Sequence, residues 1–197
     1  MRLATLTTVA ALALAAAACS NEPTSDDLST EANLAEDASA DDVLGANAAQ
    51  PDAALPTDGN GFAVAVAASD LYEIESAKLA ASQGTSKEVK DFAGQLLTDH
   101  QKSTADLKTA ASQVNVTVTP ALDAEKQAMI DQLKAASGAE FDRLFLEQQK
   151  TAHQKALALL QSFASGGDAE PLKAFATKAA GVVEGHIQHL NGIRQPS

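Results

Sequence analysis

The sequence Asn115-Val116-Thr117-Val118-Thr119-Pro120 separates two pairs of helical segments. It alternates β-branched with polar residues and ends in proline, so it interrupts the 3.6-residue periodicity found on both sides. Thr119 and Pro120 are placed to begin a short helix that would end near Gly138. We therefore expect about 25 residues, including this short helix, between the two pairs, which is enough to cross a helical bundle from end to end.

Four long helical segments are predicted around this break: 62–82, 85–114, 139–164 and 168–193. Thr85-Ser86-Lys87-Glu88 has the pattern of a capping box for the second segment, and Asp168 is the expected cap of the last. Only two or three residues join the members of each pair, so each pair should be an antiparallel hairpin. Together with the long connection, this predicts an all-α protein: a ferritin-like four-helix bundle with one crossover that contains a short extra helix.

Charge is distributed unevenly along the 197 residues, whose net charge is −12. Residues 20–60 contain ten acidic residues and no basic one. With few apolar residues, residues 19–60 should be a disordered, self-repelling tether. Residues 61–197 hold 16 acidic and 13 basic residues. This last part is expected to be the folded domain, and its near-neutral charge argues against nucleic acid as a partner.

The N-terminus has the pattern of a lipoprotein signal peptide over residues 1–18. Arg2 precedes an apolar run that is too short to anchor the chain in a bilayer permanently. Ala16-Ala17-Ala18-Cys19 resembles a bacterial lipobox, in which the cysteine is acylated and becomes the first residue. The alternative is ordinary secretory cleavage with Cys19 incidental. Because Cys19 is the only cysteine, the lipoprotein is favoured, with the membrane as a partner through acylated Cys19.

One ionisable residue on each long helix is predicted to face the bundle interior. At about 100° per residue, Glu75 lies about 20° from Val64 on what we take as the buried face, whereas Glu73 lies opposite and should be solvated. His100, His153 and His186 each lie within an apolar stripe of their own helix. His189 lies about 60° to the side of His186, so it either contacts this group or lies on the surface.

These four residues are a plausible ligand set for a transition metal. Helix lengths place His100 and His153 together at mid-height, with Glu75 and His186 about 7 Å away. Three imidazoles and a carboxylate suit Zn²⁺, Cu²⁺ or Fe²⁺. The alternative is a metal-free polar cluster that only fixes how the helices align.

Five blocks of the sequence resemble one family. They are Ser69-Asp70-Leu71-Tyr72-Glu73-Ile74-Glu75-Ser76-Ala77-Lys78-Leu79-Ala80, Val89-Lys90-Asp91-Phe92-Ala93, Asp99-His100, Gly138-Ala139-Glu140-Phe141-Asp142 and Ala152-His153-Gln154-Lys155-Ala156. This order is similar to that of the bacterial outer membrane proteins of the domain of unknown function 4142 family. The resemblance implies a ferritin-like fold and a lipid-anchored protein of the cell envelope, on the periplasmic face of the outer membrane. Asp99, beside His100, is a further candidate for a group that contacts the ligands.

A di-iron centre is not expected. Carboxylate-bridged di-iron bundles use Glu-x-x-His on two helices, and here no acidic residue stands three positions before any histidine. The sequence also lacks a phosphate-binding glycine loop and a Gly-x-Ser-x-Gly motif, so an enzyme is the less favoured interpretation. The sequence thus predicts a metal-binding envelope protein or, alternatively, a metal-free envelope interaction or stress-related binding module. It does not identify a protein partner.

Overall fold

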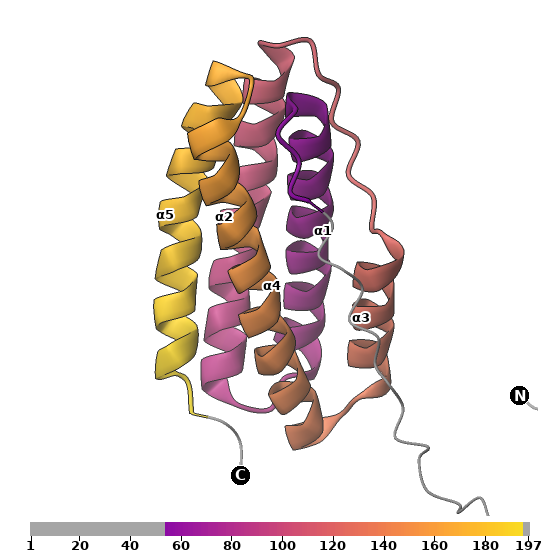
Figure 1. Ribbon diagram of the computed structural model, residues 1–197. Helices are drawn as coiled ribbons and strands as arrows, with labels where there is room; N and C mark the ends of the chain where they lie inside the picture. The colour runs from indigo at the N-terminus through magenta and orange to yellow at the C-terminus, as the bar shows by residue number, and fades with distance from the viewer. Residues whose placement is uncertain (1–53, 195–197) are drawn as a thin grey trace, which may run out of the picture. The chain divides into compact units, whose positions relative to one another are not determined.

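The computed structural model describes residues 54–194, in which it shows five α-helices and no β-strand (Figure 1). The helices are α1 (Gly59–Gln83), α2 (Lys87–Ser112), α3 (Ala124–Ala135), α4 (Gly138–Gly166) and α5 (Glu170–Gly192). The predicted signal peptide, Cys19 and most of the predicted tether lie outside the described residues. Within residues 54–194, every helix is too short or too polar to cross a bilayer.

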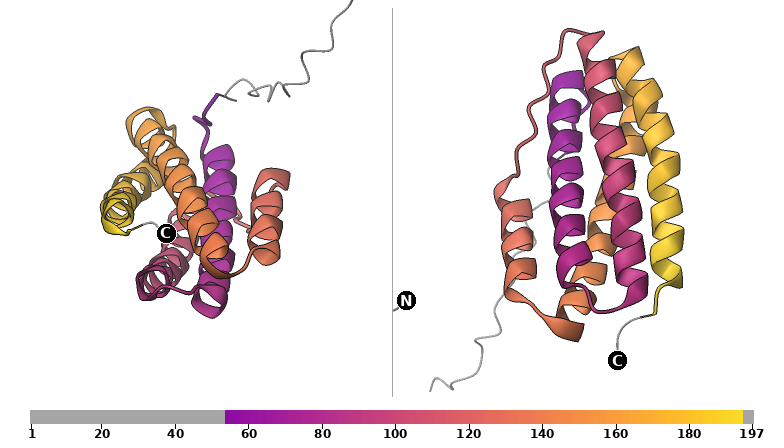
Figure 2. Two further views of the ribbon diagram at one scale, coloured as in Figure 1. Left: turned by 90° about the horizontal axis from the view of Figure 1, so that it is seen from below. Right: turned by 180° about the vertical axis from the view of Figure 1, so that it is seen from behind.

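The helices form two antiparallel hairpins, α1–α2 and α4–α5, packed side by side (Figures 1 and 2). Around the bundle, α1 contacts α2, α2 contacts α5, α5 contacts α4 and α4 contacts α1. The connection after α2 returns along the outside of the bundle to α3, which packs against α1. This confirms the predicted fold: an all-α, ferritin-like bundle with a long crossover and one short extra helix.

Asn115 ends the first hairpin at the predicted break. Its φ of 58° lies in the left-handed region, which asparagine tolerates better than most residues, and the Val116 N–H donates to the Ala111 carbonyl at 3.0 Å. The short helix begins later than predicted, at Ala124. The Asp123 carboxylate caps it by accepting from the Lys126 N–H at 2.8 Å. The predicted start at Thr119-Pro120 is therefore wrong, because these residues belong to the extended part of the crossover.

The turn between α1 and α2 is closed by a residue of the other hairpin. Asp142 of α4 is fully buried and accepts hydrogen bonds from the Thr85 N–H at 2.9 Å and the Ser86 N–H at 2.8 Å. Ser86, and not Thr85, is the N-cap of α2, since its hydroxyl accepts from the Val89 N–H at 3.1 Å. The N-cap is thus one residue later than predicted, and the predicted capping box does not form, because the residue three positions after Ser86 is Val89. Thr85 is instead bound by the Asp142 carboxylate.

The predicted cap of α5 is also displaced by one residue. Ala169 is the N-cap, and within the described chain no side chain caps this helix end. Asp168 instead donates its backbone N–H to the Thr57 carbonyl at 3.3 Å, which joins the α4–α5 turn to the segment before α1.

The interior consists of two apolar clusters separated by a polar layer. The first lies at the crossover end of α2 and contains Phe62 stacked on Phe163, with ring centroids 3.9 Å apart. The second lies toward the α1–α2 turn and contains Phe92 and Phe145. On every long helix, the buried polar residues fall between the positions that belong to the two clusters, except for Asp142, which lies at the α1–α2 turn. The polar layer is therefore at mid-length of the bundle, which is where a functional site would be enclosed.

Candidate metal site

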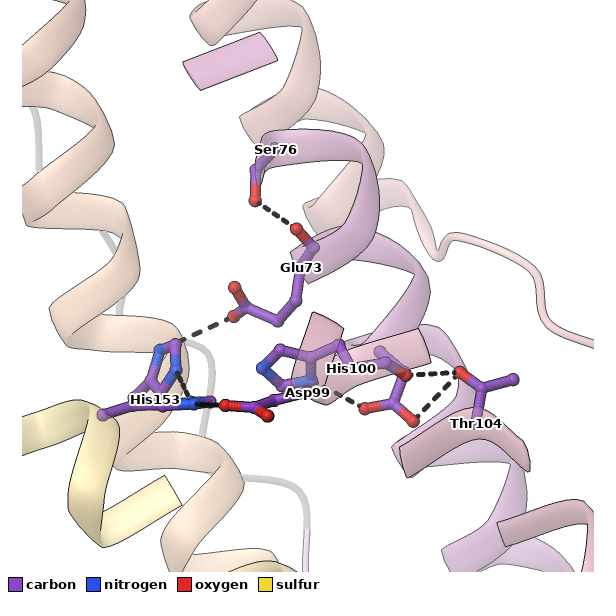
Figure 3. A network of polar contacts seen from close by, with 8 residues as sticks. Glu73, Ser76, Asp99, His100, Thr104 and His153 are labelled. Atoms are coloured by element: carbon purple, nitrogen blue, oxygen red, sulfur yellow. Dashed lines mark hydrogen bonds and ion pairs between the residues drawn. The ribbon is translucent and has the colours of Figure 1, made fainter. Parts of the chain in front are cut away.

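Three histidines from three helices meet in the polar layer. Figure 3 shows two of them, His100 and His153, with Glu73 and Asp99 beside them. His100 of α2, His153 of α4 and His186 of α5 are 7%, 1% and 1% exposed. One ring nitrogen of each lies within 4.8 Å of the corresponding nitrogens of the other two. The prediction that His186 lies about 7 Å from the other two along the bundle axis is wrong. That value depended on the helix ends, and α2, α4 and α5 begin and end one or two residues away from where the sequence placed them.

Each imidazole is held by an acceptor on its outer side. The hydrogen bonds, all 2.9 Å long, join His100 Nδ1 to Asp70 Oδ1, His153 Nδ1 to the backbone oxygen of Gln149, and His186 Nε2 to Asp99 Oδ2. A carbonyl or carboxylate oxygen only accepts, so these three ring nitrogens carry the hydrogens. In the neutral rings, the remaining nitrogens then bear lone pairs, which is the arrangement that metal-binding histidines require.

Two of these lone pairs point at each other. His153 Nε2 lies 3.1 Å from His186 Nδ1. Burial lowers the pKa of His153 to about 3, and burial also lowers the pKa of His186 despite the contact with Asp99. With both rings neutral, no proton lies between the two nitrogens, and their lone pairs repel each other. A cation placed among the rings would turn this repulsion into coordination.

His100 supplies the third inward nitrogen. Its Nε2 is buried and has no hydrogen-bond partner among residues 54–194. Burial lowers the pKa of His100, but the hydrogen bond to Asp70 and the charge of Glu73 outweigh it, so the pKa is raised overall. Asp70 is held in turn by the Thr104 hydroxyl at 3.2 Å. The His100–Asp70 pair is therefore the one position in the cluster where an ion would compete with a proton.

The buried carboxylate of α1 belongs to Glu73, not to Glu75. Glu73 is 2% exposed, and its Oε1 lies 3.7 Å from His153 Nδ1. Its Oε2 has no hydrogen-bond partner in the part of the chain that the structure describes, and burial raises its pKa to about 7. The Glu75 side chain is 42% exposed and pairs with Lys78 at 2.8 Å. The prediction that Glu75 faces the core and Glu73 faces solvent is wrong.

The error comes from the two apolar faces of α1. Leu71 and Leu79 line a surface depression together with Ile130 of α3, so they face the short helix. Val64, the reference for the predicted face, is 52% exposed. Phe62 is the better reference, because a residue eleven positions later falls about 20° away on a helix, and that residue is Glu73.

Of the two other predicted residues, Asp99 belongs to the histidine cluster and His189 does not. Asp99 accepts the hydrogen bond from His186 described above. His189 is exposed, hydrogen-bonds Gln95 at 2.9 Å and lies edge-on to Phe92 with ring centroids 5.1 Å apart. Asp70 was missed, although it lies three positions before Glu73 and therefore on the same helix face.

The fold and the site together define a class of protein: a ferritin-like helical bundle with a histidine cluster enclosed at mid-length. Within this class, the chain belongs to the family described as "Domain of unknown function (DUF4142)", which matches residues 44–193. No curated protein matches the chain.

Solved structures with a similar fold include two named for metals. CopM in the Cu(II)-bound form is 18% identical, with a TM-score of 0.58 over 68% of this chain and 94% of that chain. CopM in the Cu(I)-bound form is also 18% identical, with a TM-score of 0.55 and the same coverage. A DUF305 fragment from Deinococcus radiodurans is 15% identical, with a TM-score of 0.60 over 68% of this chain and 93% of that one. At these identities, the similarity is one of fold.

Proposed function

We propose that this protein binds one divalent transition-metal ion through His100, His153 and His186. The observation that carries the proposal is the common direction of their hydrogen bonds. Each ring has one nitrogen fixed outward by an acceptor, and the three remaining nitrogens lie within 4.8 Å of one another. Metal-binding histidines are oriented in the same way, because the outer acceptor fixes the tautomer and raises the basicity of the inner nitrogen.

The charges around the cluster also favour a cation. Asp70, Glu73 and Asp99 surround three imidazoles of which two are neutral. Across residues 54–194, these three carboxylates pair with histidines and with no lysine or arginine. Two of them, Asp70 and Glu73, are buried. Burying carboxylates without compensating positive charge is unfavourable, and a divalent ion would supply that charge. Glu73 adds its charge next to the cluster, since its Oε1 lies 3.7 Å from His153 Nδ1.

The donor atoms favour Cu²⁺ and Zn²⁺ among the predicted metals. Both bind imidazole well, and Cu²⁺ forms the more stable complexes in the divalent series. Met129 is the only sulfur-containing residue in the described range, and it lines a different cavity. A site without sulfur suits Cu²⁺ better than Cu⁺. The fold shared with CopM, solved in copper-bound forms, supports copper as the first metal to test.

The proposal is tested by titrating purified full-length protein with Cu²⁺. We expect one ion per chain, with nitrogen hyperfine structure in the electron paramagnetic resonance spectrum. His186→Leu should abolish this binding. His189→Leu is the matched control, because His189 lies on the same helix but is exposed. Equal binding by the two variants, or no stoichiometric binding by the wild type, would contradict the proposal and favour the metal-free interaction module.

We also propose that the protein is lipid-anchored in the cell envelope through Cys19, on the periplasmic face of the outer membrane. The support is the single cysteine after Ala16-Ala17-Ala18 and the acidic segment that would hold the domain away from the membrane. Cys19→Ser should move the protein from the membrane fraction to the soluble envelope fraction without changing its fold. A Cys19→Ser protein that is still membrane-bound would show that the anchor is wrong.

A further inference from the structure

Large side chains close the seam between α1 and α4 at two levels. Phe62 stacks on Phe163 with ring centroids 3.9 Å apart, and the Tyr72 hydroxyl donates to Gln148 at 3.1 Å. Between these levels, four small side chains line the seam on the side of α3: Ala65, Ser69, Ala152 and Ala156. Small side chains at neighbouring positions of two packed helices leave a space that the larger residues on either side do not fill.

A cavity of about 190 Å³ lies at these small residues. Met129 of α3 and the segment before α1, through Leu55 and Pro56, form its other apolar walls. Leu55 is 44% exposed, so the cavity reaches the protein surface there, whereas Tyr72 is 1% exposed and lines its inner end. The three histidines of the proposed metal site are not part of this lining.

The volume of the cavity indicates the size of molecule that it can hold. A water molecule occupies about 30 Å³ in the liquid, and an apolar cavity of about 150 Å³ accepts benzene. On this scale, the volume of about 190 Å³ suits a molecule of about seven or eight non-hydrogen atoms. The alanine, leucine and methionine side chains of the walls suit an apolar body.

The charged residues of the lining are already paired. They are Glu125, Lys126 and Lys155. Lys155 Nζ lies 2.7 Å from Glu125 Oε1, and Lys126 Nζ lies 2.6 Å from Asp123 Oδ2. The lining therefore offers no uncompensated charge, and burying an ionic group without a counter-charge is unfavourable. A neutral molecule meets no such penalty.

The hydroxyl groups of the lining determine the polar part of such a molecule. Two of the three are engaged, since Tyr72 donates to Gln148 at 3.1 Å and Thr151 donates to the Glu147 carbonyl at 3.2 Å. The third belongs to Ser69, which makes no side-chain hydrogen bond within residues 54–194. A serine hydroxyl can donate and accept, so it can bind either a hydroxyl or a carbonyl group of a ligand.

We propose that the α1–α4 cavity binds a neutral small molecule of about seven or eight non-hydrogen atoms, with an apolar body and one hydroxyl or carbonyl group that hydrogen-bonds Ser69. This site goes beyond the proposed metal binding, because it needs no ion and none of the three histidines lines it. Its selectivity would come from the size of the cavity and from a single hydrogen bond.

The test is a fluorine NMR titration of full-length protein, without added metal, with 4-fluorophenol and 4-fluorotoluene. Both probes are neutral at pH 7 and have the same number of non-hydrogen atoms, but only the phenol has a hydroxyl group. We expect saturable binding of both probes to the wild type. Ser69→Ala should weaken 4-fluorophenol binding about fivefold, through the loss of one hydrogen bond, and change 4-fluorotoluene binding less than about twofold.

A second variant assigns the binding to this cavity. Ala152→Leu should fill the space and weaken both probes at least about tenfold. Ala152 lines this cavity and not the neighbouring cavity of about 100 Å³ between α2 and α5. Ala158→Leu is the matched control, since Ala158 lies on the same helix but is exposed and outside the lining.

Three outcomes would overturn the proposal. The first is the absence of saturable binding of either probe to the wild type. The second is an equal response of Ala152→Leu and Ala158→Leu, because the probes would then bind elsewhere. The third is an equal effect of Ser69→Ala on both probes, which would exclude the hydrogen bond. If Ala152→Leu does not fold, amide NMR of the wild type replaces it: shifts at Ala65 and Ala152 on adding 4-fluorophenol would support the site, and their absence would overturn it.

Discussion

The two apolar clusters and the polar layer between them are both buried, but only the layer contains polar atoms that need hydrogen-bond partners. In the clusters, aromatic side chains pack in pairs, Phe62 on Phe163 in the first and Phe92 on Phe145 in the second, and leave no polar group to compensate. In the polar layer, Glu73 Oε2, His100 Nε2 and Gln149 Oε1 are buried and have no hydrogen-bond partner within residues 54–194. The comparison indicates that the clusters stabilise the bundle more than the layer does. Under the proposed function, metal binding would compensate the unpartnered polar atoms of the layer.

Phe163→Ala should give the largest effect. Phe163 is buried and stacks on Phe62, and removing a buried phenylalanine side chain typically costs about 3–5 kcal/mol. We expect this loss in urea denaturation both with and without metal, because the change lies outside the polar layer. Val64→Ala, at an exposed position, should change the unfolding free energy by less than about 0.5 kcal/mol. A small loss for Phe163→Ala would contradict the assignment of stability to the clusters.

Glu73→Gln should stabilise the metal-free protein, and more so at high pH. Burial raises the folded-state pKa of Glu73 from 4.5 to about 7, so between these values the folded state holds a proton that the unfolded state has lost. The wild type therefore loses stability as the pH rises through this range, and the loss is complete above about pH 7. The variant should be more stable by on the order of 3 kcal/mol at pH 8 and by about 1 kcal/mol at pH 5 in urea denaturation.

The same substitution should weaken metal binding, because it removes a negative charge close to the ion. A gain in unfolding free energy together with a loss of metal affinity in Glu73→Gln would be the clearest evidence that the polar layer serves metal binding. Glu75→Gln is the control and should change neither quantity appreciably, since Glu75 is a surface residue. Destabilisation by Glu73→Gln at pH 8 would show that the carboxylate has a partner in solution that compensates its burial.

Cu²⁺ should raise the melting temperature of the wild type but not that of His100→Leu or His186→Leu. A free metal concentration of about 100 times Kd adds about 2.7 kcal/mol to the unfolding free energy. Without metal, His100→Leu should lower the stability, because it leaves the buried Asp70 carboxylate with the Thr104 hydroxyl alone. His186→Leu should cost less, because its partner Asp99 has a side chain that is 34% exposed and can be hydrated. Thermal denaturation with and without Cu²⁺ measures both effects. Equal metal-induced shifts in all three proteins would rule out the site.

The metal-induced shift should shrink as the pH falls toward 5. An imidazole must be neutral to coordinate, and the raised pKa of His100 means that its proton competes with metal before the protons of the other two rings do. Burial keeps the pKa of His153 at about 3, so His153 contributes no such competition in this range. The check is the Cu²⁺-induced shift measured from pH 8 to pH 5. A shift that does not depend on pH would contradict coordination by His100.

Removal of residues 20–43 should have the smallest effect. This part of the predicted tether precedes both the family match and the described residues, and its composition offers little apolar surface for packing. We expect the melting temperature to stay within about two degrees, since a segment without an apolar face contributes no core. The deletion must stop before Thr57, whose carbonyl accepts from Asp168. A larger decrease would indicate that the segment packs on the domain.

The topology was predictable from the sequence because it depends on local signals. Helical periodicity, short connections within the hairpins and a β-branched break between them are all readable without knowing tertiary contacts. The caps were less predictable. Thr85 satisfies the sequence pattern of an N-cap, but Asp142, a residue of α4, accepts its N–H and moves the start of α2 to Lys87.

The site was predictable on helices with one apolar face. His100, His153 and His186 lie on α2, α4 and α5, where polar and apolar faces are well separated, and all three are buried as expected. Helix α1 packs against both the bundle and α3, so it is apolar on two sides and its periodicity does not say which side is the interior. This is why the sequence pattern predicted Glu75, and not Glu73, as the inward carboxylate of α1.

The bonds from Asp142 to the α1–α2 turn bear on how the chain folds. Asp142 accepts hydrogen bonds from the amides of Thr85 and Ser86, which lie 57 and 56 positions before it in the sequence. The crossover separates them from Asp142. The first hairpin on its own would therefore leave its tightest turn unsecured. We expect the two hairpins to fold and unfold as one cooperative unit, with the turn residues protected from amide hydrogen exchange only once α4 has docked. An α1–α2 hairpin that is duplicated or moved to another protein would need a carboxylate in the place of Asp142 to bind its turn.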